Sequence, residues 1–169
     1  AEGAAGQYRN AGVRGRSRGM RAYRFQPGPI HLLRLDRGSD LVEAITRYAA
    51  EQQIRAAWFT YLGAVSAASL RYYDQIEHEY HDFTLDRHLE VLSGVGNVSL
   101  LDGAPFVHTH AAFGDDQGLA LGGHLNRGCT VFALEVNLQE LIGEPPVRLP
   151  DEATGLKLWR GDPNDHPRP

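Results

Sequence analysis

Cysteine is nearly absent from this chain, since Cys129 is the only one among 169 residues. An internal disulfide is therefore excluded, and so are zinc sites built on paired cysteines. Any metal site must use histidine or carboxylate ligands. Because Cys129 begins an apolar stretch, we expect its thiol to be buried and unreactive.

Long apolar runs are also missing. No run approaches the roughly 18 residues that a membrane-spanning helix needs, and no segment resembles a secretory signal. We therefore expect a cytoplasmic protein with no membrane partner. The sequence also lacks a phosphate-binding loop, a dinucleotide fingerprint and a nucleophile elbow, which disfavours ATP, NAD and serine-hydrolase chemistry.

Positive charge is scarce outside the first residues. The chain has 17 Lys and Arg against 21 Asp and Glu, and four of those arginines lie within residues 1–19. Residues 20–169 hold 13 basic and 20 acidic residues. So acidic a domain is a poor non-specific binder of nucleic acid, because neutralising phosphates needs a surplus of cations. A DNA contact would have to come from a local patch, the basic leader or a partner.

Composition divides the chain into three parts. Residues 1–19, rich in Gly, Ala and Arg, form a flexible basic leader that cannot bury a core. One interpretation is that the leader is non-native and the natural chain starts at Met20, the only methionine; the other is a degenerate AT-hook at residues 14–18, with Ser17 in place of the proline. Residues 20–145 form the domain, and residues 146–169 a C-terminal extension with one strand at 155–159.

Hydrophobic periodicity predicts an α+β fold, a mainly antiparallel β-sheet with one main helix packed on it. The helix covers residues 40–53, capped by Ser39 or Asp40. The expected strands are 21–26 and 30–35 separated by a break, 56–73 broken at Gly63, 87–101 with a bulge at 94–96, then 105–113, 119–121 and 129–136. Residues 74–86 form a loop or edge hairpin, Asp102-Gly103 a type I′ turn, and residues 138–142 a helical turn.

Three histidines carry the strongest chemical signal. His108 and His110 are two apart on a strand, so their imidazoles project from one face. His124 follows one hairpin later, after Gly122 and Gly123, whose missing Cβ atoms allow close approach. Three neutral imidazoles with open positions suit a divalent ion, zinc first, with iron(II) and nickel as alternatives. The competing interpretation is polar residues on a solvent face.

Two further residues are candidates for a role beside the histidines. Glu90 is a candidate acid or base, and Arg127 a cation for a small anionic ligand. The alternative makes Glu90 an edge-strand surface acid and Arg127 a turn cation. His78 and His81 fall in the charged segment 74–86 and are expected to be solvated.

Residues 90–110 (EVLSGVGNVSLLDGAPFVHTH), 122–128 (GGHLNRG) and 132–136 (FALEV) together resemble the PPC domain, conserved in plants and prokaryotes. The resemblance covers roughly residues 22–143. It implies a homotrimer, a metal site at the histidines His108, His110 and His124, and a fold similar to that of acetolactate decarboxylase, which uses three histidines on zinc. It also implies a DNA-binding name, inherited from plant relatives whose AT-hook contacts the DNA.

Three functions stay open at the level of the sequence. One is a stand-alone prokaryotic PPC-domain protein, DNA-binding or regulatory, with a three-histidine metal site. The others are a metal-dependent lyase-like or hydrolase-like enzyme acting on a small anionic substrate, and a small-ligand binding module. Homotrimerisation agrees with the apolar strand segments 58–62 and 131–134 and with Tyr72 and Tyr73, which together exceed what one helix can cover.

Overall fold

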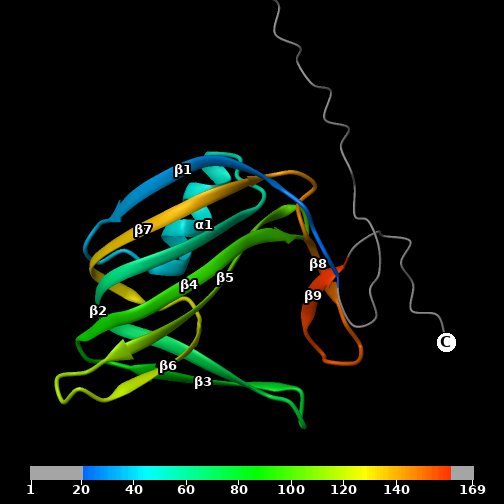
Figure 1. Cartoon of the computed structure of the whole chain (residues 1–169). Helices are drawn as coiled ribbons and strands as arrows, with labels where there is room; N and C mark the ends of the chain where they lie inside the picture. Colours follow the sequence, from blue (N-terminus) through cyan, green and yellow to red (C-terminus); the bar gives the residue numbers. More distant parts are fainter. Residues whose placement is uncertain (1–20, 161–169) are drawn as a thin grey trace, which may run out of the picture.

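The computed structural model describes residues 21–160, so the leader expected at residues 1–19 and the last nine residues lie outside it. The described chain forms nine strands and one helix (Figure 1). They are β1 (Gln26–Leu35), α1 (Leu41–Glu51), β2 (Ala57–Asp74), β3 (Glu79–Leu85), β4 (Leu89–Leu101), β5 (Ala104–Gly114), β6 (Ala120–Leu125), β7 (Thr130–Ile142), β8 (Val147–Pro150) and β9 (Lys157–Arg160).

One sheet contains all nine strands, in the order β1-β7-β2-β6-β5-β4-β8-β9 with β3 paired to β2. Neighbours are antiparallel except β4 and β8, which meet in parallel at Leu100 and Val147. The 18-residue β2 pairs with β4 and β7 along its first part and with β3 and β6 along its second. Because β4, β5 and β6 also pair in series, these four strands close into a ring. The predicted antiparallel α+β class is confirmed.

Helix α1 lies across one face of the sheet (Figure 1). Asp40 caps it, because its carboxylate accepts a hydrogen bond of 2.8 Å from the backbone N–H of Glu43. The other oxygen of Asp40 accepts from the N–H groups of Gly128 and Cys129 at the start of β7. One carboxylate thus fixes the helix to the sheet, and the apolar side chains Leu41, Ala44, Ile45 and Ala49 pack into the core.

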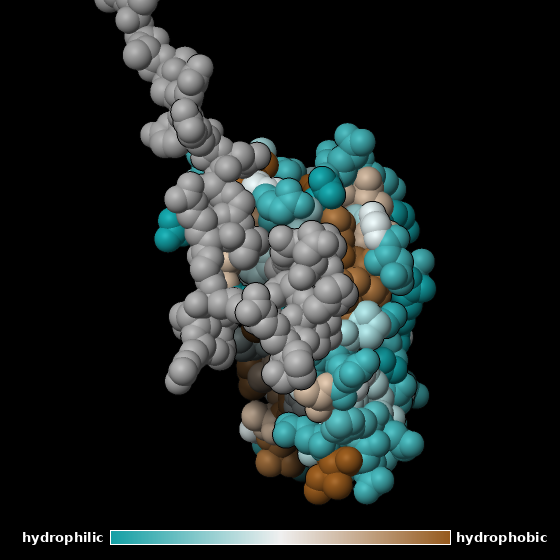
Figure 2. All heavy atoms as spheres, turned by 90° about the vertical axis from the view of Figure 1, so that its right-hand side faces the viewer, coloured by the Kyte–Doolittle hydropathy of each residue, from teal (hydrophilic) through white to brown (hydrophobic). Residues whose placement is uncertain are grey.

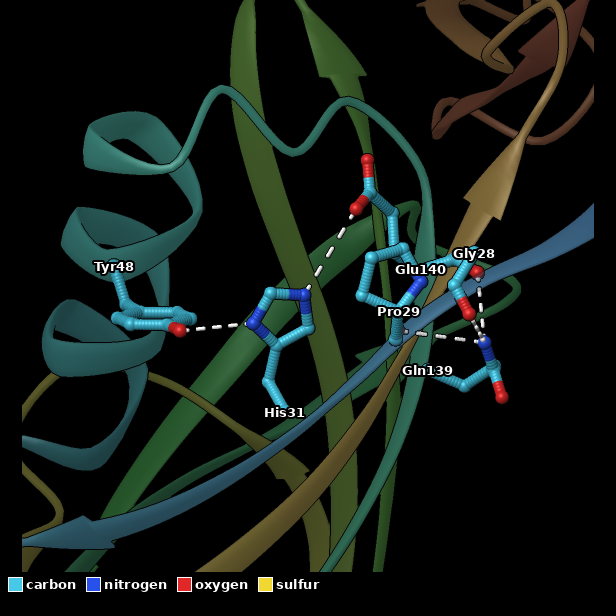
Figure 3. Close-up of polar contacts among 6 residues, drawn as sticks. All are labelled: Gly28, Pro29, His31, Tyr48, Gln139 and Glu140. Atoms are coloured by element: carbon cyan, nitrogen blue, oxygen red, sulfur yellow. Dashed lines mark hydrogen bonds and ion pairs between the residues drawn. The ribbon is translucent and has the colours of Figure 1, made fainter.

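A histidine on the edge strand β1 joins that strand to helix α1. His31 of β1 lies between Tyr48 of α1 and Glu140 of β7 (Figure 3). Its Nδ1 is 2.9 Å from the Tyr48 hydroxyl, and its Nε2 is 3.8 Å from Glu140 Oε2. The neighbouring Gln139 amide donates to the carbonyl of Gly28 at 2.7 Å. These contacts tie β1, β7 and α1 together.

The core fills the space between the helix and the inner face of the sheet, centred on Phe59, Phe113, Ile45 and Leu138. The thiol of Cys129 is fully buried there, and burial raises its pKa to about 11, in agreement with the expected inert cysteine. On the face that Figure 2 shows, hydrophilic residues predominate and hydrophobic ones form smaller groups. No helix within residues 21–160 has the length and apolar character to cross a membrane.

Four local predictions were wrong. Residues 21–25, expected as strand, are irregular, and β1 begins only at Gln26. The helical turn at 138–142 is strand, because β7 continues to Ile142 in register with β1. The break at 27–29 is a register shift inside a continuous β1. The bulge expected at 94–96 lies between Val91 and Ser93 instead. Gly94 and Gly96 serve packing, since a Cβ there would overlap the rings of Tyr61 and Phe59.

The hairpins were predicted better. Asp102 and Gly103 both have positive φ, 52° and 80°, as the type I′ turn requires. Residues 74–86 form an edge hairpin rather than a loop, with β3 paired to the end of β2. The C-terminal extension contains two paired strands, β8 and β9, where one was expected.

Candidate metal centre

The three histidines come together through strand register. His110 of β5 lies directly opposite His124 of β6, and His124 lies opposite Arg71 of β2. Arg71 in turn pairs with Asp82 of β3. His108 projects from the same face as His110 because the residues that alternate with them, Val107, Thr109 and Ala111, are buried. One row of cross-strand neighbours therefore brings His110 and His124 together, and His108 joins them from two residues away on the same face of β5.

The imidazoles of this histidine cluster (His108, His110 and His124) have the spacing of a shared ligand set. One ring nitrogen from each lies within 4.8 Å of the other two. His124 Nδ1 and His110 Nε2 are 3.3 Å apart, and two nitrogens bound tetrahedrally to one zinc ion would be about 3.3 Å apart. The donor set therefore fits a divalent transition metal.

Burial keeps these imidazoles in the form that binds a metal. Desolvation is the largest cause that lowers the pKa of His108 to about 4, followed by the positive charge of Arg148. Desolvation also lowers the pKa of His124 to about 4 and lowers that of His110. All three rings are neutral at pH 7, so no proton must leave before an ion binds.

The two glycines before His124 differ in what they allow. At Gly122 a Cβ would lie 2.0 Å from the carbonyl oxygen of Ala111, so β5 and β6 can approach there only with glycine. At Gly123 the nearest atom would be 3.6 Å away, in ordinary contact. Gly123 lines the pocket in front of the cluster.

A tyrosine supports the histidine strand from the core side. The Tyr61 hydroxyl is 3.0 Å from the Thr109 hydroxyl and 3.2 Å from the His110 carbonyl oxygen, to which it donates. Thr109 donates in turn to the carbonyl of Val95 on β4, at 2.8 Å. Burial raises the pKa of the Tyr61 phenol well above its usual range, so it stays protonated. This network fixes the backbone between the two β5 histidines.

The three histidines line one pocket of about 620 Å³, with His108 and His124 half-buried and His110 exposed. Aromatic rings form one side: Tyr73 and Tyr80 are 4.8 Å apart between centroids, and His78 lies 6.2 Å from Tyr73. The C-terminal hairpin forms another side through Thr154 and Leu156. The Tyr73 hydroxyl donates to the Thr154 carbonyl at 2.5 Å, which holds the two sides together.

Two arginines flank the histidines: Arg71 is paired with a carboxylate, and Arg148 with neutral oxygens. Arg71 makes a two-pronged contact with Asp82, with both N–O distances 2.9 Å, and its guanidinium lies 4.6 Å from the Tyr80 ring centre. Arg148 of β8 is 93% buried and donates to the neutral oxygens of Ser99, Asn97 and Lys157. Within residues 21–160, no carboxylate forms an ion pair with Arg148.

Glu90 and Arg127 lie away from this pocket. Glu90 lines a separate hollow of about 340 Å³ with His88 and Phe132. Arg127 is exposed on the turn between β6 and β7, where its backbone N–H bonds to the Asn126 side chain. The structure therefore brings neither of them to the histidine pocket, and Arg71 and Arg148 take the flanking positions. Neither arginine could be found from sequence neighbourhood, since each reaches the site through strand pairing.

His78 is exposed, as expected, and its ring also lines the histidine pocket beside Tyr73. His81 stays on the exposed edge strand β3. The position of His78 follows from the tight turn between β2 and β3, where its φ is 55°. The sequence shows the polar segment but not the strand register that places this ring beside Tyr73.

Comparison with known proteins identifies relatives. The family model described as the Plants and Prokaryotes Conserved (PCC) domain matches residues 23–142. A metal-containing protein from Archaeoglobus fulgidus is 46% identical, with a TM-score of 0.80 over 83% of this chain and 99% of that one. A plant- and prokaryote-conserved (PPC) protein from Pyrococcus horikoshii is 35% identical, with a TM-score of 0.77 over 86% of this chain and 97% of its own.

More distant matches show less. A candidate DNA-binding protein from Bacteroides thetaiotaomicron has the same fold, with 21% identity and a TM-score of 0.73 over 81% of this chain and 97% of its own. The acetolactate decarboxylase of Bacillus subtilis aligns with a TM-score of 0.48 and 18% identity, so it carries no inference. A bifunctional protein GlmU from Synechococcus is 37% identical over 141 residues, 79% of this chain. The chain spans about a fifth of the length of that relative.

Proposed function

This chain belongs to the Plants and Prokaryotes Conserved domain family, and within it we propose a protein that binds one divalent transition metal at His108, His110 and His124. The observation that carries the proposal is the convergence of three neutral imidazoles, their nitrogens within 4.8 Å, in the lining of one pocket. The metal-containing relative from Archaeoglobus fulgidus supports it. Zinc is the first expectation because three neutral imidazoles suit it.

His108, His110 and His124 would hold the ion, which would supply Lewis-acid polarisation of a bound oxygen group. The chain's own residues would orient a ligand there: Tyr73 and Tyr80 by ring contact, and Arg148 by its charge. This arrangement suits a lyase-like or hydrolase-like reaction as well as simple ligand binding.

Metal analysis of untagged protein tests the proposal. We expect roughly one zinc per chain after reconstitution and dialysis, and none in the triple variant His108→Ala, His110→Ala, His124→Ala. The double variant His81→Ala, His88→Ala removes histidines outside the cluster and should keep its metal. Metal-free wild-type protein after reconstitution, or equal loading of the triple variant, would overturn the proposal.

We propose further that the protein is a homotrimer that buries the outer face of β1 and β2. Three large apolar side chains on this face are exposed: Leu32 by 80%, Leu62 by 61% and Trp58 by 49%. Leu32 and Leu62 border one depression of about 650 Å³. Large exposed apolar side chains gathered around one depression are typical of subunit interfaces.

The mass of the protein in solution tests this arrangement. We expect three times the chain mass of 18.7 kDa by light scattering. Leu62→Asp should yield monomers, because it places a carboxylate in the interface core. Leu119→Asp changes an equally exposed leucine, 60%, outside the depression and should leave the trimer intact. A monomeric wild-type protein would contradict the assembly.

DNA binding is the second candidate function, favoured by the fold shared with a candidate DNA-binding protein. The excess of acidic residues in 20–169, 20 against 13 basic, opposes it. A DNA affinity that falls steeply with salt and survives removal of residues 1–19 would support a role for the domain itself. Affinity that disappears with the leader would assign the contact to residues 1–19.

A further inference from the structure

The hairpin of β8 and β9 extends the histidine pocket beyond the family domain. The family match ends at residue 142, yet Ala153, Thr154 and Leu156 line the pocket. Arg148 of the same hairpin bonds to Asn97, the residue directly opposite His108 on the neighbouring strand. The part of the chain after residue 142 therefore shapes what can reach the cluster.

The charges around the pocket leave a positive site without a negative partner. Imidazole binds a metal ion as a neutral ligand, so the three histidines would not offset the charge of a divalent ion. Arg71 is neutralised by Asp82, whereas Arg148 has only neutral acceptors among residues 21–160. No acidic side chain of the described residues lines the pocket. A buried cation beside an ion in this setting favours an anionic ligand.

The walls restrict the shape of that ligand. Tyr73 and Tyr80 present rings from adjacent strands, and Leu156 adds an apolar side chain from the hairpin. Flat or apolar groups pack well on such surfaces, because aromatic rings favour stacked and edge-to-face contacts. The space of about 620 Å³ suits a small molecule rather than a polymer.

We infer that the histidine pocket binds a small carboxylate with a flat apolar body, and that the β8–β9 hairpin sets this preference through Arg148 and Leu156. The inference rests on the proposed metal site, because the carboxylate would meet the ion at its open positions. The carboxylate would lie toward the cluster and the apolar body between the tyrosines and Leu156. Arg148 stays buried behind His108 and acts through its charge rather than by direct contact.

Cobalt(II)-loaded protein, with benzoate, benzamide and acetate as probes, tests the inference through the visible absorption of the ion. We expect benzoate to perturb the spectrum, with an affinity at least roughly ten-fold above that of uncharged benzamide and of acetate, which lacks the ring. If cobalt binds and benzoate leaves its spectrum unchanged, the inference is wrong while the metal site stands. If no cobalt binds, the proposed function itself fails.

Charge variants test the role of the hairpin. Leu156→Asp should lower benzoate affinity roughly ten-fold by repulsion, whereas Leu158→Asp makes the same change two residues away, outside the pocket lining. Arg148→Met should lower benzoate affinity several-fold and Arg148→Lys should retain it. Cobalt content and melting temperature report folding, and the leucine pair stays informative if Arg148→Met does not fold. Equal benzoate affinity in Leu156→Asp and Leu158→Asp would overturn the role of the hairpin.

Discussion

His31 and the histidine cluster are two ways of placing imidazoles on one sheet. His31 is held between a tyrosine hydroxyl and a carboxylate, Tyr48 and Glu140, each from a different element (Figure 3). The cluster has no carboxylate contact of this kind within residues 21–160, and its rings contact each other, two pairs of them edge to face, at centroid distances of 5.0–5.2 Å. His31 therefore has its partners inside the protein, whereas the cluster needs one from outside.

The difference shows how surroundings decide the role of a histidine. His31, with a hydrogen bond at Nδ1 and the Glu140 carboxylate 3.8 Å from Nε2, joins elements of the fold. In the cluster, the nitrogen lone pairs of three neighbouring neutral imidazoles have few protein partners until an ion binds to them. Removing metal should therefore disturb the cluster and leave the His31 contacts unchanged.

The largest effect is expected in metal affinity. His124→Ala removes one of three ligands and should weaken zinc binding by roughly 100-fold or more, because even the loss of an outer partner costs 10–100-fold. His31→Ala should leave zinc affinity within about two-fold. Competition titration against a chromogenic chelator measures both. A similar loss in the two variants would mean that the cluster and His31 are not separate sites.

Acid should destabilise the metal-free protein through the cluster. The pKa values of His108 and His124 are about 4 in the folded protein, against about 6.5 in an unfolded chain. Between these values the unfolded chain binds more protons, so this stability is fully present above pH 6.5 and is lost as pH falls to 4. Urea unfolding at several pH values should show a steeper decline for wild type than for His108→Gln, His124→Gln. Parallel declines would contradict the prediction.

Sequence patterns predicted the parts of the fold that depend on local chemistry. The helix with its Asp40 cap and the turn at Asp102-Gly103 follow from side-chain type and backbone preference. The helical turn expected at residues 138–142 failed because pairing with β1 overrides local propensity. Local signals could not show where β7 ends.

The residues of the site also fall into those that local sequence predicts and those that depend on long-range strand pairing. The i, i+2 spacing of His108 and His110 is local, so their common face could be predicted. The approach of Arg71, Tyr80 and Arg148 depends on how distant strands pair, and no short motif encodes that. Glu90 lies close to the histidines in sequence order but lines another hollow, because β4 runs past the site rather than ending at it.

Replacing His31 should cost stability rather than function. His31→Ala removes the contacts with Tyr48 and Glu140 and should lower the free energy of unfolding by about 1–2 kcal/mol. In a double-mutant cycle, His31→Ala and Tyr48→Phe should show a coupling of about 1 kcal/mol. Urea denaturation of metal-free protein gives these values. Additive losses would mean that the hydrogen bond of 2.9 Å contributes nothing.

The smallest expected effect comes from removing a tyrosine hydroxyl. Tyr61 contacts the strand of the histidine cluster, and Tyr48 contacts His31. Tyr61→Phe loses the contacts with Thr109 and the His110 carbonyl, while Thr109 keeps its own bond to Val95. We expect a loss of about 1 kcal/mol in unfolding free energy and a few-fold weaker zinc binding, since the backbone between the β5 histidines loosens. Tyr48→Phe, the matched control, should cost similar stability and leave zinc affinity unchanged. Equal zinc affinities in the two variants would show that β5 is held in place without Tyr61.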